Sequence, residues 1–245
     1  MTQLPGTELP VAGTWSAGPV LVTGGAGGLG AAIAAAVSAR GGRPVVLDRR
    51  KPEDSDAGAL TWIEVDLADP HAAARAVQEA AAEAGPPAGV VTAAGIDACG
   101  RLDDVDLDDW VRVVQVNLLG TAAVIRAALP DLRRTRGRVV TVASTLGIKA
   151  VGDATAYCAS KFGVVGFTRA LATETAGEVG VTLLIPGGMR TGFFDGRPDQ
   201  YKPGPDAVLA DPADVAEAAV FALTRPAGVE LRELVVCSPV ETSWP

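Results

Sequence analysis

Residues 19–30 read PVLVTGGAGGLG, and the chain continues to residue 40 as AAIAAAVSAR. The apolar start of this stretch predicts a buried strand, and its alanine-rich end predicts a helix. Glycines at such a junction permit a tight turn and bring backbone N–H groups close to a pyrophosphate, which then lies at the positive N-terminus of the helix. The stretch therefore predicts a first strand and a first helix joined by a dinucleotide-binding turn.

Apolar runs rich in Val, Leu and Ile recur along the chain. They occupy residues 19–24, 44–48, 60–66, 89–95, 138–144, 181–187 and 233–239. Their nearly continuous apolar character is typical of strands that helices cover on both faces. Helical patterns lie between them, for example at residues 69–85 and 211–225. The alternation predicts an α/β fold with one doubly wound, parallel, seven-stranded sheet.

The length and composition indicate one domain. The 245 residues are 48% hydrophobic, enough for a substantial core, and no linker or repeat divides them. We expect residues 1–17 to form a flexible arm and residues 18–245 a single domain. The irregular segment at about 189–210 is long for an internal loop, which predicts a lid. The first residues have neither a basic start nor an apolar core, so we expect no signal peptide and no membrane anchor.

Charge and cysteine content exclude several classes of function. A formal net charge of -8 without a basic stripe argues against a nucleic-acid partner. Cys99, Cys158 and Cys237 form no CxxC pair, which argues against a disulfide framework and a zinc site and fits a cytoplasmic protein. The single histidine, His71, is interpreted as a surface residue, so no metal site is expected.

An acidic residue follows the glycine turn at the end of the second strand. Asp48 lies 18 positions after Gly30, where a carboxylate accepts both ribose hydroxyls of NAD and repels the 2′-phosphate of NADP. NAD is therefore favoured over NADP, although Arg49 and Arg50 offer guanidinium groups that offset this repulsion. A role for Asp48 as a simple strand end stays open. Asp66, which ends the third strand, is a candidate adenine contact.

Residues 155–161 read TAYCASK and place Tyr157 four positions before Lys161. On a helix, these side chains share one face, which serves packing or solubility in many proteins. A phenol has an ordinary pKa near 10, too high for a base at neutral pH. We expect the Lys161 ammonium and a positive nicotinamide ring to lower this pKa by about two or three units.

Taken together, the motifs resemble those of the short-chain dehydrogenase/reductase family in its single-domain form. Thr23, Gly24, Gly28 and Gly30 match its TGxxxGxG, and residues 157–161 contain its YxxxK. Further matches are Ser144, 13 positions before Tyr157, Asn117 in QVNLLG, and the PGxxxT segment at residues 186–191. The resemblance covers about residues 18–239. One departure is TAAG at residues 92–95, where members commonly have NNAG or NAAG, and this puts cofactor affinity in doubt.

The resemblance implies a Rossmann-type catalytic domain that moves a hydride between a nicotinamide cofactor and a small secondary alcohol or ketone. Tyr157 would exchange the proton, Lys161 would also hold the nicotinamide ribose, and Ser144 would hold the substrate oxygen. Asn117 would hold a water that links Lys161 to bulk solvent. A homo-oligomer, tetramer or dimer, is implied as well. The expected cofactor-binding residues are Thr23, Gly24, Gly27, Gly28, Leu29, Gly30, Asp48, Arg49, Asp66, Leu67, Ala93, Ala94, Gly95, Tyr157, Lys161, Pro186, Gly187, Met189 and Thr191.

Two other functions stay open at this point. The first is an NADPH-dependent biosynthetic ketoreductase of the 3-oxoacyl type, because Arg49 and Arg50 could pair with the 2′-phosphate of NADPH. The fold also suits a dinucleotide-binding sensor without catalysis, which the set of four candidate catalytic residues disfavours. The substrate is not specified. The lid carries Phe193, Phe194 and Tyr201 beside Arg190, Arg197 and Lys202. An apolar substrate with an anionic group stays open, and we favour the interpretation of these charges as solvated. Cys99 is a candidate pocket residue.

Overall fold

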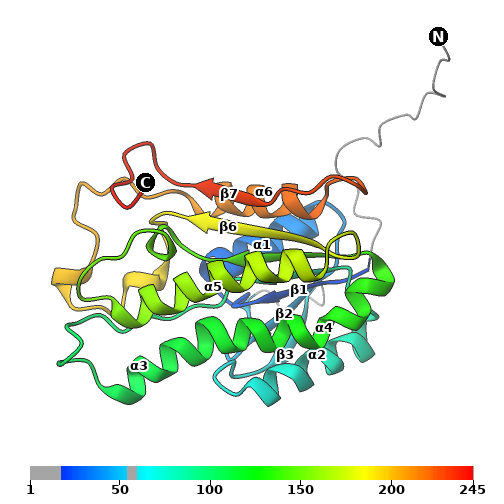
Figure 1. The fold of residues 1–245 in the computed structure, drawn as a ribbon, viewed down its shortest axis with the longest axis horizontal. Coiled ribbons are helices and arrows are strands. Elements are labelled where there is room, and N and C mark those ends of the chain that lie inside the picture. Colours follow the sequence, from blue (N-terminus) through cyan, green and yellow to red (C-terminus); the bar gives the residue numbers. More distant parts are fainter. Residues whose placement is uncertain (1–17, 54–59, 245) are drawn as a thin grey trace, which may run out of the picture.

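The computed structural model describes residues 18–53 and 60–244 (Figure 1). Its centre is a seven-stranded sheet with the order β3-β2-β1-β4-β5-β6-β7, in which all neighbours are parallel. The expected arm at residues 1–17 lies outside the described residues. The strands are β1 (Val20–Thr23), β2 (Pro44–Asp48), β3 (Thr61–Glu64), β4 (Gly89–Thr92), β5 (Arg138–Val142), β6 (Gly180–Pro186) and β7 (Glu233–Val236).

Helices cover both faces of the sheet, as predicted. Figure 1 shows α1 (Gly28–Ala39) and α6 (Pro212–Leu223) together on one face, and α2 (Pro70–Ala84), α4 (Thr121–Thr135) and α5 (Thr155–Glu174) on the other. Local signals set two of the helix starts. The side chain of Asp69 accepts hydrogen bonds from the first turn of α2, and that of Asp211 does so for α6. The doubly wound α/β fold is confirmed.

The core consists of two layers, one on each face of the sheet, and successive side chains of a strand point alternately into one layer and the other. Leu21 and Val90 face the layer under α2 and α4, whereas Val20 and Val91 face the layer under α1 and α6. All four are fully buried. Because successive side chains of a strand point to opposite faces, a strand between two helical layers must be apolar at every position.

One long helical stretch crosses the outside of the sheet. It consists of α3 (Leu107–Val114), a π-helical turn at Gln115–Gly120, and α4. An 18-residue window within Leu107–Thr135 has a mean hydropathy of 1.4, which would suit a membrane span by length and composition. However, 44% of that window is buried inside the protein, and α4 packs on α2. One side of α4 therefore belongs to the core of this domain.

The sheet order reverses between β1 and β4, which are neighbours although β2 and β3 separate them in the chain. Beyond their ends, the hydroxyl of Thr23 accepts a hydrogen bond of 3.1 Å from the N–H of Ala94. Several strands end earlier than predicted; residues 93–95, for example, leave the sheet and form a loop. In such folds, this reversal opens a crevice at the carboxyl ends of the strands, where ligands bind.

Candidate active site

The glycine turn between β1 and α1 has no room for side chains at two positions. Gly24 has a φ of +70°, and a Cβ there would lie 2.7 Å from the Cα of Ala94. A Cβ on Gly30 would lie 2.2 Å from the carbonyl oxygen of Gly24. No side chain caps the N-terminus of α1 at Gly27. A helix start without a side-chain cap is compatible with a bound pyrophosphate, and its role in cofactor binding stays a prediction.

Asp48 lies at the end of β2, beside this turn. Its carboxylate accepts hydrogen bonds of 3.0 Å from the backbone N–H groups of Ala26 and Arg50. The Arg50 guanidinium extends over the turn, since a Cβ on Gly27 would lie 3.1 Å from its Nη2. A carboxylate and a cation thus lie side by side at the glycine turn.

Asp66 has partners that the sequence did not indicate. Its carboxylate pairs with Arg112 at 2.7 Å and accepts a hydrogen bond of 2.9 Å from the N–H of Ala68. Burial alone would raise the pKa of Asp66, but these hydrogen bonds outweigh burial and lower it. The carboxylate is therefore held ionised by protein groups, and its adenine contact stays a prediction.

Tyr157 and Lys161 lie on one face of α5 and are both buried. The Nζ of Lys161 donates a hydrogen bond of 2.9 Å to the carbonyl of Val142 and lies 5.6 Å from the centre of the Tyr157 ring. Burial lowers the pKa of Lys161 to about 8, because removal from water disfavours the charged amine. The amine is thus poised to change its protonation near neutral pH.

The pKa of Tyr157 shifts in the direction opposite to the expected one. Burial raises it to about 12, although a hydrogen bond with Ser144 acts the other way. Lys161 cannot reverse this shift, because its ammonium is itself destabilised by burial and is bound to Val142. The expected lowering by Lys161 and a positive nicotinamide ring together stays a prediction, and the chain by itself does not show it. A positive nicotinamide ring would have to supply the lowering.

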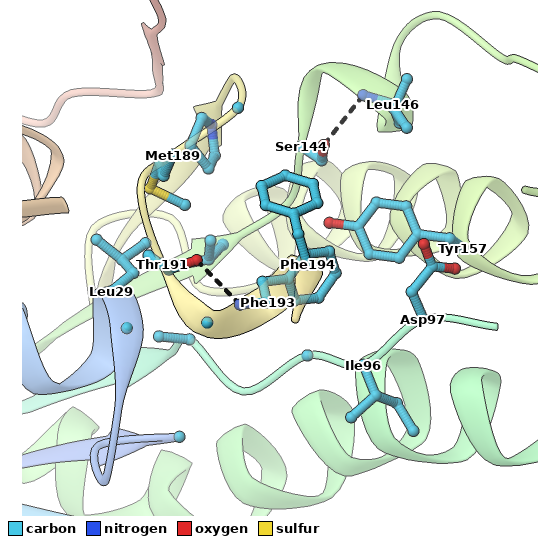
Figure 2. Close-up of a pocket in the computed structure, with 18 of the residues that line it drawn as sticks. Leu29, Ile96, Asp97, Ser144, Leu146, Tyr157, Met189, Thr191, Phe193 and Phe194 are labelled. Atoms are coloured by element: carbon cyan, nitrogen blue, oxygen red, sulfur yellow. Dashed lines mark hydrogen bonds between the residues drawn. The ribbon is translucent and has the colours of Figure 1, made fainter. Parts of the chain in front are cut away.

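Ser144 follows β5 and begins the short 3-10 helix Thr145–Gly147. Its hydroxyl accepts a hydrogen bond of 3.1 Å from the N–H of Leu146, which fixes the side chain at the pocket wall. Figure 2 shows the Tyr157 hydroxyl pointing into the space that Ser144 and Phe193 border. The two hydroxyls can thus meet one substrate oxygen.

Asn117 lies in the π-helical turn between α3 and α4, behind the pocket. Its side chain donates hydrogen bonds to the carbonyl of Ile96, at 2.9 Å, and to Ser160, at 3.0 Å, and accepts one of 2.9 Å from the N–H of Ile96. The amide therefore fastens the loop after β4 to α5. Its expected role in holding a water stays a prediction.

Residues of the segment at 189–210 line one side of the pocket, and the expected role of this segment as a lid stays a prediction. Its base is fastened by hydrogen bonds of 2.9 Å from the N–H of Arg190 to the carbonyl of Ala210 and from the N–H of Ala210 to that of Gly188. Phe193 packs on Tyr157 with ring centres 5.7 Å apart. Arg197 pairs with Asp97 at 2.7 Å, and both side chains are largely buried. The interpretation of this charge as solvated is wrong for Arg197.

The C-terminal segment forms another wall. The Glu241 carboxylate accepts hydrogen bonds from the N–H of Gly188, at 2.9 Å, and from the Ser243 hydroxyl, at 2.6 Å. The Ser243 oxygen also lies 2.7 Å from Oγ1 of Thr145. Because a hydroxyl has one proton, Ser243 donates to Glu241 and accepts from Thr145. The tail thereby connects the loop after β5 with the loop after β6.

These elements enclose one cavity of about 1290 Å³. Of the predicted site residues, Thr23 and Asn117 support the cavity from behind, and all the others line it. Sequence reasoning missed Asp97, Arg112 and Glu241, whose partners are distant in the chain and leave no local signal. The predicted residues that line the cavity are Gly24, Gly27, Gly28, Leu29, Gly30, Asp48, Arg49, Asp66, Leu67, Ala93, Ala94, Gly95, Ser144, Tyr157, Lys161, Pro186, Gly187, Met189 and Thr191.

The thiol of Cys99 and the hydroxyl of Thr92 also lie at or near the site. Cys99 lines the cavity, but burial and the neighbouring Asp97 raise the pKa of its thiol to about 11, which makes it a poor nucleophile. Thr92, which replaces the asparagine of the resembled motif, is buried, and its hydroxyl has no hydrogen-bond partner among residues 18–53 and 60–244. Over the same residues, no group of three or more His, Cys, Asp or Glu could hold a metal ion.

Comparisons with known proteins show the family of this chain. Residues 19–202 match the family model for the short chain dehydrogenase. The chain belongs to this family. The short chain dehydrogenases are oxidoreductases that act on alcohols and ketones with a nicotinamide cofactor, and this protein is accordingly one of them.

Individual relatives of this short chain dehydrogenase differ in length. D-threitol dehydrogenase from Mycolicibacterium smegmatis is 35% identical over 217 residues, which are 82% of this chain and 84% of that protein. Glycine betaine reductase from Emericella nidulans is 31% identical over 88% of this chain, but the chain spans only 18% of it. The closed form of a serine dehydrogenase complexed with NADP+ superimposes with a TM-score of 0.83 at 26% identity, covering 90% of this chain and 94% of that one.

Proposed function

We propose that this short chain dehydrogenase transfers a hydride between NAD and a small secondary alcohol or the matching ketone. The observation that carries the proposal is the meeting of Ser144, Tyr157 and Lys161 in the same cavity as the glycine turn. Binding, proton exchange and substrate orientation can all be assigned to described residues. The bound nicotinamide supplies the hydride acceptor or donor.

The glycine turn and the start of α1 would hold the pyrophosphate of the cofactor. The fit rests on Gly24 and Gly30, where a Cβ would collide with the backbone, and on the uncapped N-terminus of α1. Asp48 would accept the ribose hydroxyls, exchanging its present backbone partners or sharing them. Thr191 and Met189, which line the cavity after β6, would border the nicotinamide end.

Tyr157 would take the proton of the alcohol in oxidation and return it to the ketone oxygen in reduction. A hydroxyl with a pKa of about 12 is protonated at neutral pH, so the chain by itself presents Tyr157 as an acid. Lys161 lies behind the ring and would hold ribose hydroxyls. Ser144 would orient the substrate oxygen from the opposite side, with its own position fixed by Leu146.

An NADPH-dependent ketoreductase, for example of the 3-oxoacyl type, is the second candidate. The Arg50 guanidinium beside Gly27 favours it, because a cation there can pair with a 2′-phosphate. The structural relative complexed with NADP+ also supports it. Asp48 argues for NAD, since its carboxylate repels that phosphate.

The experiment that separates these candidates is a titration of the protein with NADH and with NADPH, followed by energy transfer from tryptophan to nicotinamide. Tight NADH and weak NADPH binding supports Asp48 as the selector. The reverse preference moves the ketoreductase to first place. A non-catalytic sensor would bind a cofactor but turn over no alcohol or ketone in a substrate screen.

A cytoplasmic homo-oligomer, tetramer or dimer, completes the proposal. Val111, Leu119 and Phe162 are apolar but between 38% and 45% exposed, which is typical of a surface that a second copy covers. The free thiols of Cys99, Cys158 and Cys237 support a reducing compartment. Light scattering coupled to size exclusion tests the assembly, and a monomer at micromolar concentration contradicts it.

A further inference from the structure

The lid carries a buried cation at the wall of the cavity. The side chain of Arg197 is only 17% exposed, and its guanidinium lies 4.7 Å from the ring centres of both Phe193 and Phe194. Two other lid cations differ from it, since Arg190 is 61% and Lys202 38% exposed. Removing a guanidinium from water is costly, so the burial of Arg197 alone among these three calls for a reason.

Asp97 pairs with Arg197 but accepts a hydrogen bond from only one of the three nitrogens of its guanidinium. The carboxylate pairs with Nη2 at 2.7 Å. Nη1 has only a 3.4 Å contact with the carbonyl of Tyr201, and the buried Nε has no partner within the part of the chain that the structure describes. Buried donors without acceptors are rare in proteins, and each calls for an explanation such as a functional role or a bound water or ion. The guanidinium therefore has donors to spare.

The carboxylate of Asp97, in contrast, has donors on both of its oxygens. Besides Arg197, it accepts a hydrogen bond of 2.7 Å from the N–H of Ala98 and one of 3.2 Å from the thiol of Cys99. The unmet hydrogen bonding of the pair thus lies on its cationic side. A ligand that meets it must bring an acceptor, and the acceptor that best fits a guanidinium is a carboxylate.

The pair lies near the candidate catalytic tyrosine. Figure 2 shows Asp97 beside Tyr157, and Phe193 contacts both the Tyr157 ring and the Arg197 guanidinium. The charges of Asp97 and Arg197 both act on the Tyr157 phenol. Much of the surrounding wall is apolar. Side chains that contribute to it are Leu146, Val151, Phe193, Phe194, Val208 and Val240.

We propose that Arg197 is a specificity-determining residue that binds a carboxylate of the substrate, so that the substrate is a hydroxy acid or oxo acid with an apolar carbon skeleton. The inference rests on the proposed hydride-transfer function and names its substrate class. Asp97 holds the guanidinium in position, while the substrate carboxylate takes the donors that Asp97 leaves. The alcohol or ketone group then reaches Tyr157 and Ser144.

Binding to the complex with reduced cofactor tests the inference without turnover. The probes are 3-hydroxybutyrate, 4-hydroxypentanoate and 5-hydroxyhexanoate, each beside its primary amide, which has nearly the same shape and no charge. Their affinities are measured through nicotinamide fluorescence of the protein saturated with NADH or NADPH. We expect at least one acid to bind about tenfold or more tightly than its amide, the size of a charge-assisted hydrogen bond.

Variants assign the preference to Arg197. The double variant Asp97→Asn/Arg197→Gln keeps an uncharged hydrogen-bonding pair and avoids a lone buried carboxylate, and we expect its acid preference to fall below about twofold. Lys202→Gln, which removes an exposed lid cation, should keep the full preference.

Two outcomes overturn the inference while the proposed function stands: cofactor binding with no acid preferred over its amide, or an acid preference that persists in the double variant. A protein that binds neither reduced cofactor contradicts the proposed function and this inference with it.

Discussion

The Nζ of Lys161 lies 5.6 Å from the centre of the Tyr157 ring, and burial shifts the pKa of each group toward its neutral form. Burial raises the pKa of the phenol to about 12 and lowers that of the amine to about 8. The pair is therefore a proton donor beside a weakened cation. Ligand charge, rather than the chain alone, must bring the phenol into its basic range.

Replacing Tyr157 by Phe should lower turnover by about a thousandfold or more. The variant lacks the hydroxyl that is proposed to exchange the proton with the substrate. Cofactor binding should change little, since the ring stays. Steady-state rates and the NADH titration measure the two effects. Tyr201→Phe is the matched control, as Tyr201 is the other tyrosine of the chain and its hydroxyl makes a 3.4 Å contact with Asp153. Equal losses in both variants would contradict the assignment.

Lys161 should make the cofactor-free protein more stable as the pH rises from 8. Its pKa is about 8 in the folded protein and 10.5 ordinarily, so the unfolded chain binds more protons between these values. Stability then increases with pH, by about 1.5 kcal/mol between pH 8 and 9.5. Urea unfolding of the wild type and of Lys161→Met gives the comparison, because the variant lacks this contribution. Parallel pH dependences would show that the amine is not buried in the native protein.

The raised pKa of Tyr157 has the opposite effect on stability: above pH 10 it makes the protein less stable as the pH rises. Its contribution to stability is complete below the ordinary pKa of 10 and is lost as the pH rises towards 12, because the folded state keeps its proton longer. We expect the unfolding free energy of the wild type to fall more steeply above pH 10 than that of Tyr157→Phe. Equal slopes would contradict the burial of an uncharged phenol.

Asp48→Ala should weaken NAD binding roughly tenfold and improve tolerance of NADP, because the ribose loses its acceptor and the 2′-phosphate loses a repelling charge. The two cofactor titrations measure this change. Arg50→Ala is the companion variant, and it should weaken NADP more than NAD, since its guanidinium lies beside Gly27. Unchanged affinities of Asp48→Ala for both cofactors would show that Asp48 does not contact the cofactor.

Ser243→Ala should lower kcat by roughly three- to tenfold with a loss of no more than about 1 kcal/mol of stability. Its hydroxyl is the link between Thr145, next to Ser144, and Glu241, which holds Gly188. Thr242→Ala keeps the contact with Lys149, because that contact uses the backbone carbonyl, and serves as the control. Turnover and thermal unfolding separate the two effects. A fall in stability without a fall in kcat would show that the link through Ser243 stabilises the fold but does not position the catalytic groups.

The fold was predictable because its signals are local and repeat along the chain. A strand buried on both faces must be apolar throughout, so Leu21 and Val20 read as one run although they face different layers. The glycine turn and the spacing of Tyr157 and Lys161 are likewise local, since a tight turn and one helical turn each span a few residues. For the same reason, Asp69 and Asp211 marked their helix starts.

The sequence by itself determined the parallel sheet, the glycine turn, and the identity of the groups that meet at the carboxyl ends of the strands. Only the tertiary structure decided how those groups are charged and paired. Arg197 and Asp97 are 100 residues apart, and Glu241 and Gly188 are 53 apart, so no local pattern links them. The raised pKa of Tyr157 in the chain alone was not predictable for a related reason: Phe193 and the rest of α5 remove the phenol from water, and desolvation depends on everything that packs around a group rather than on its neighbours in sequence.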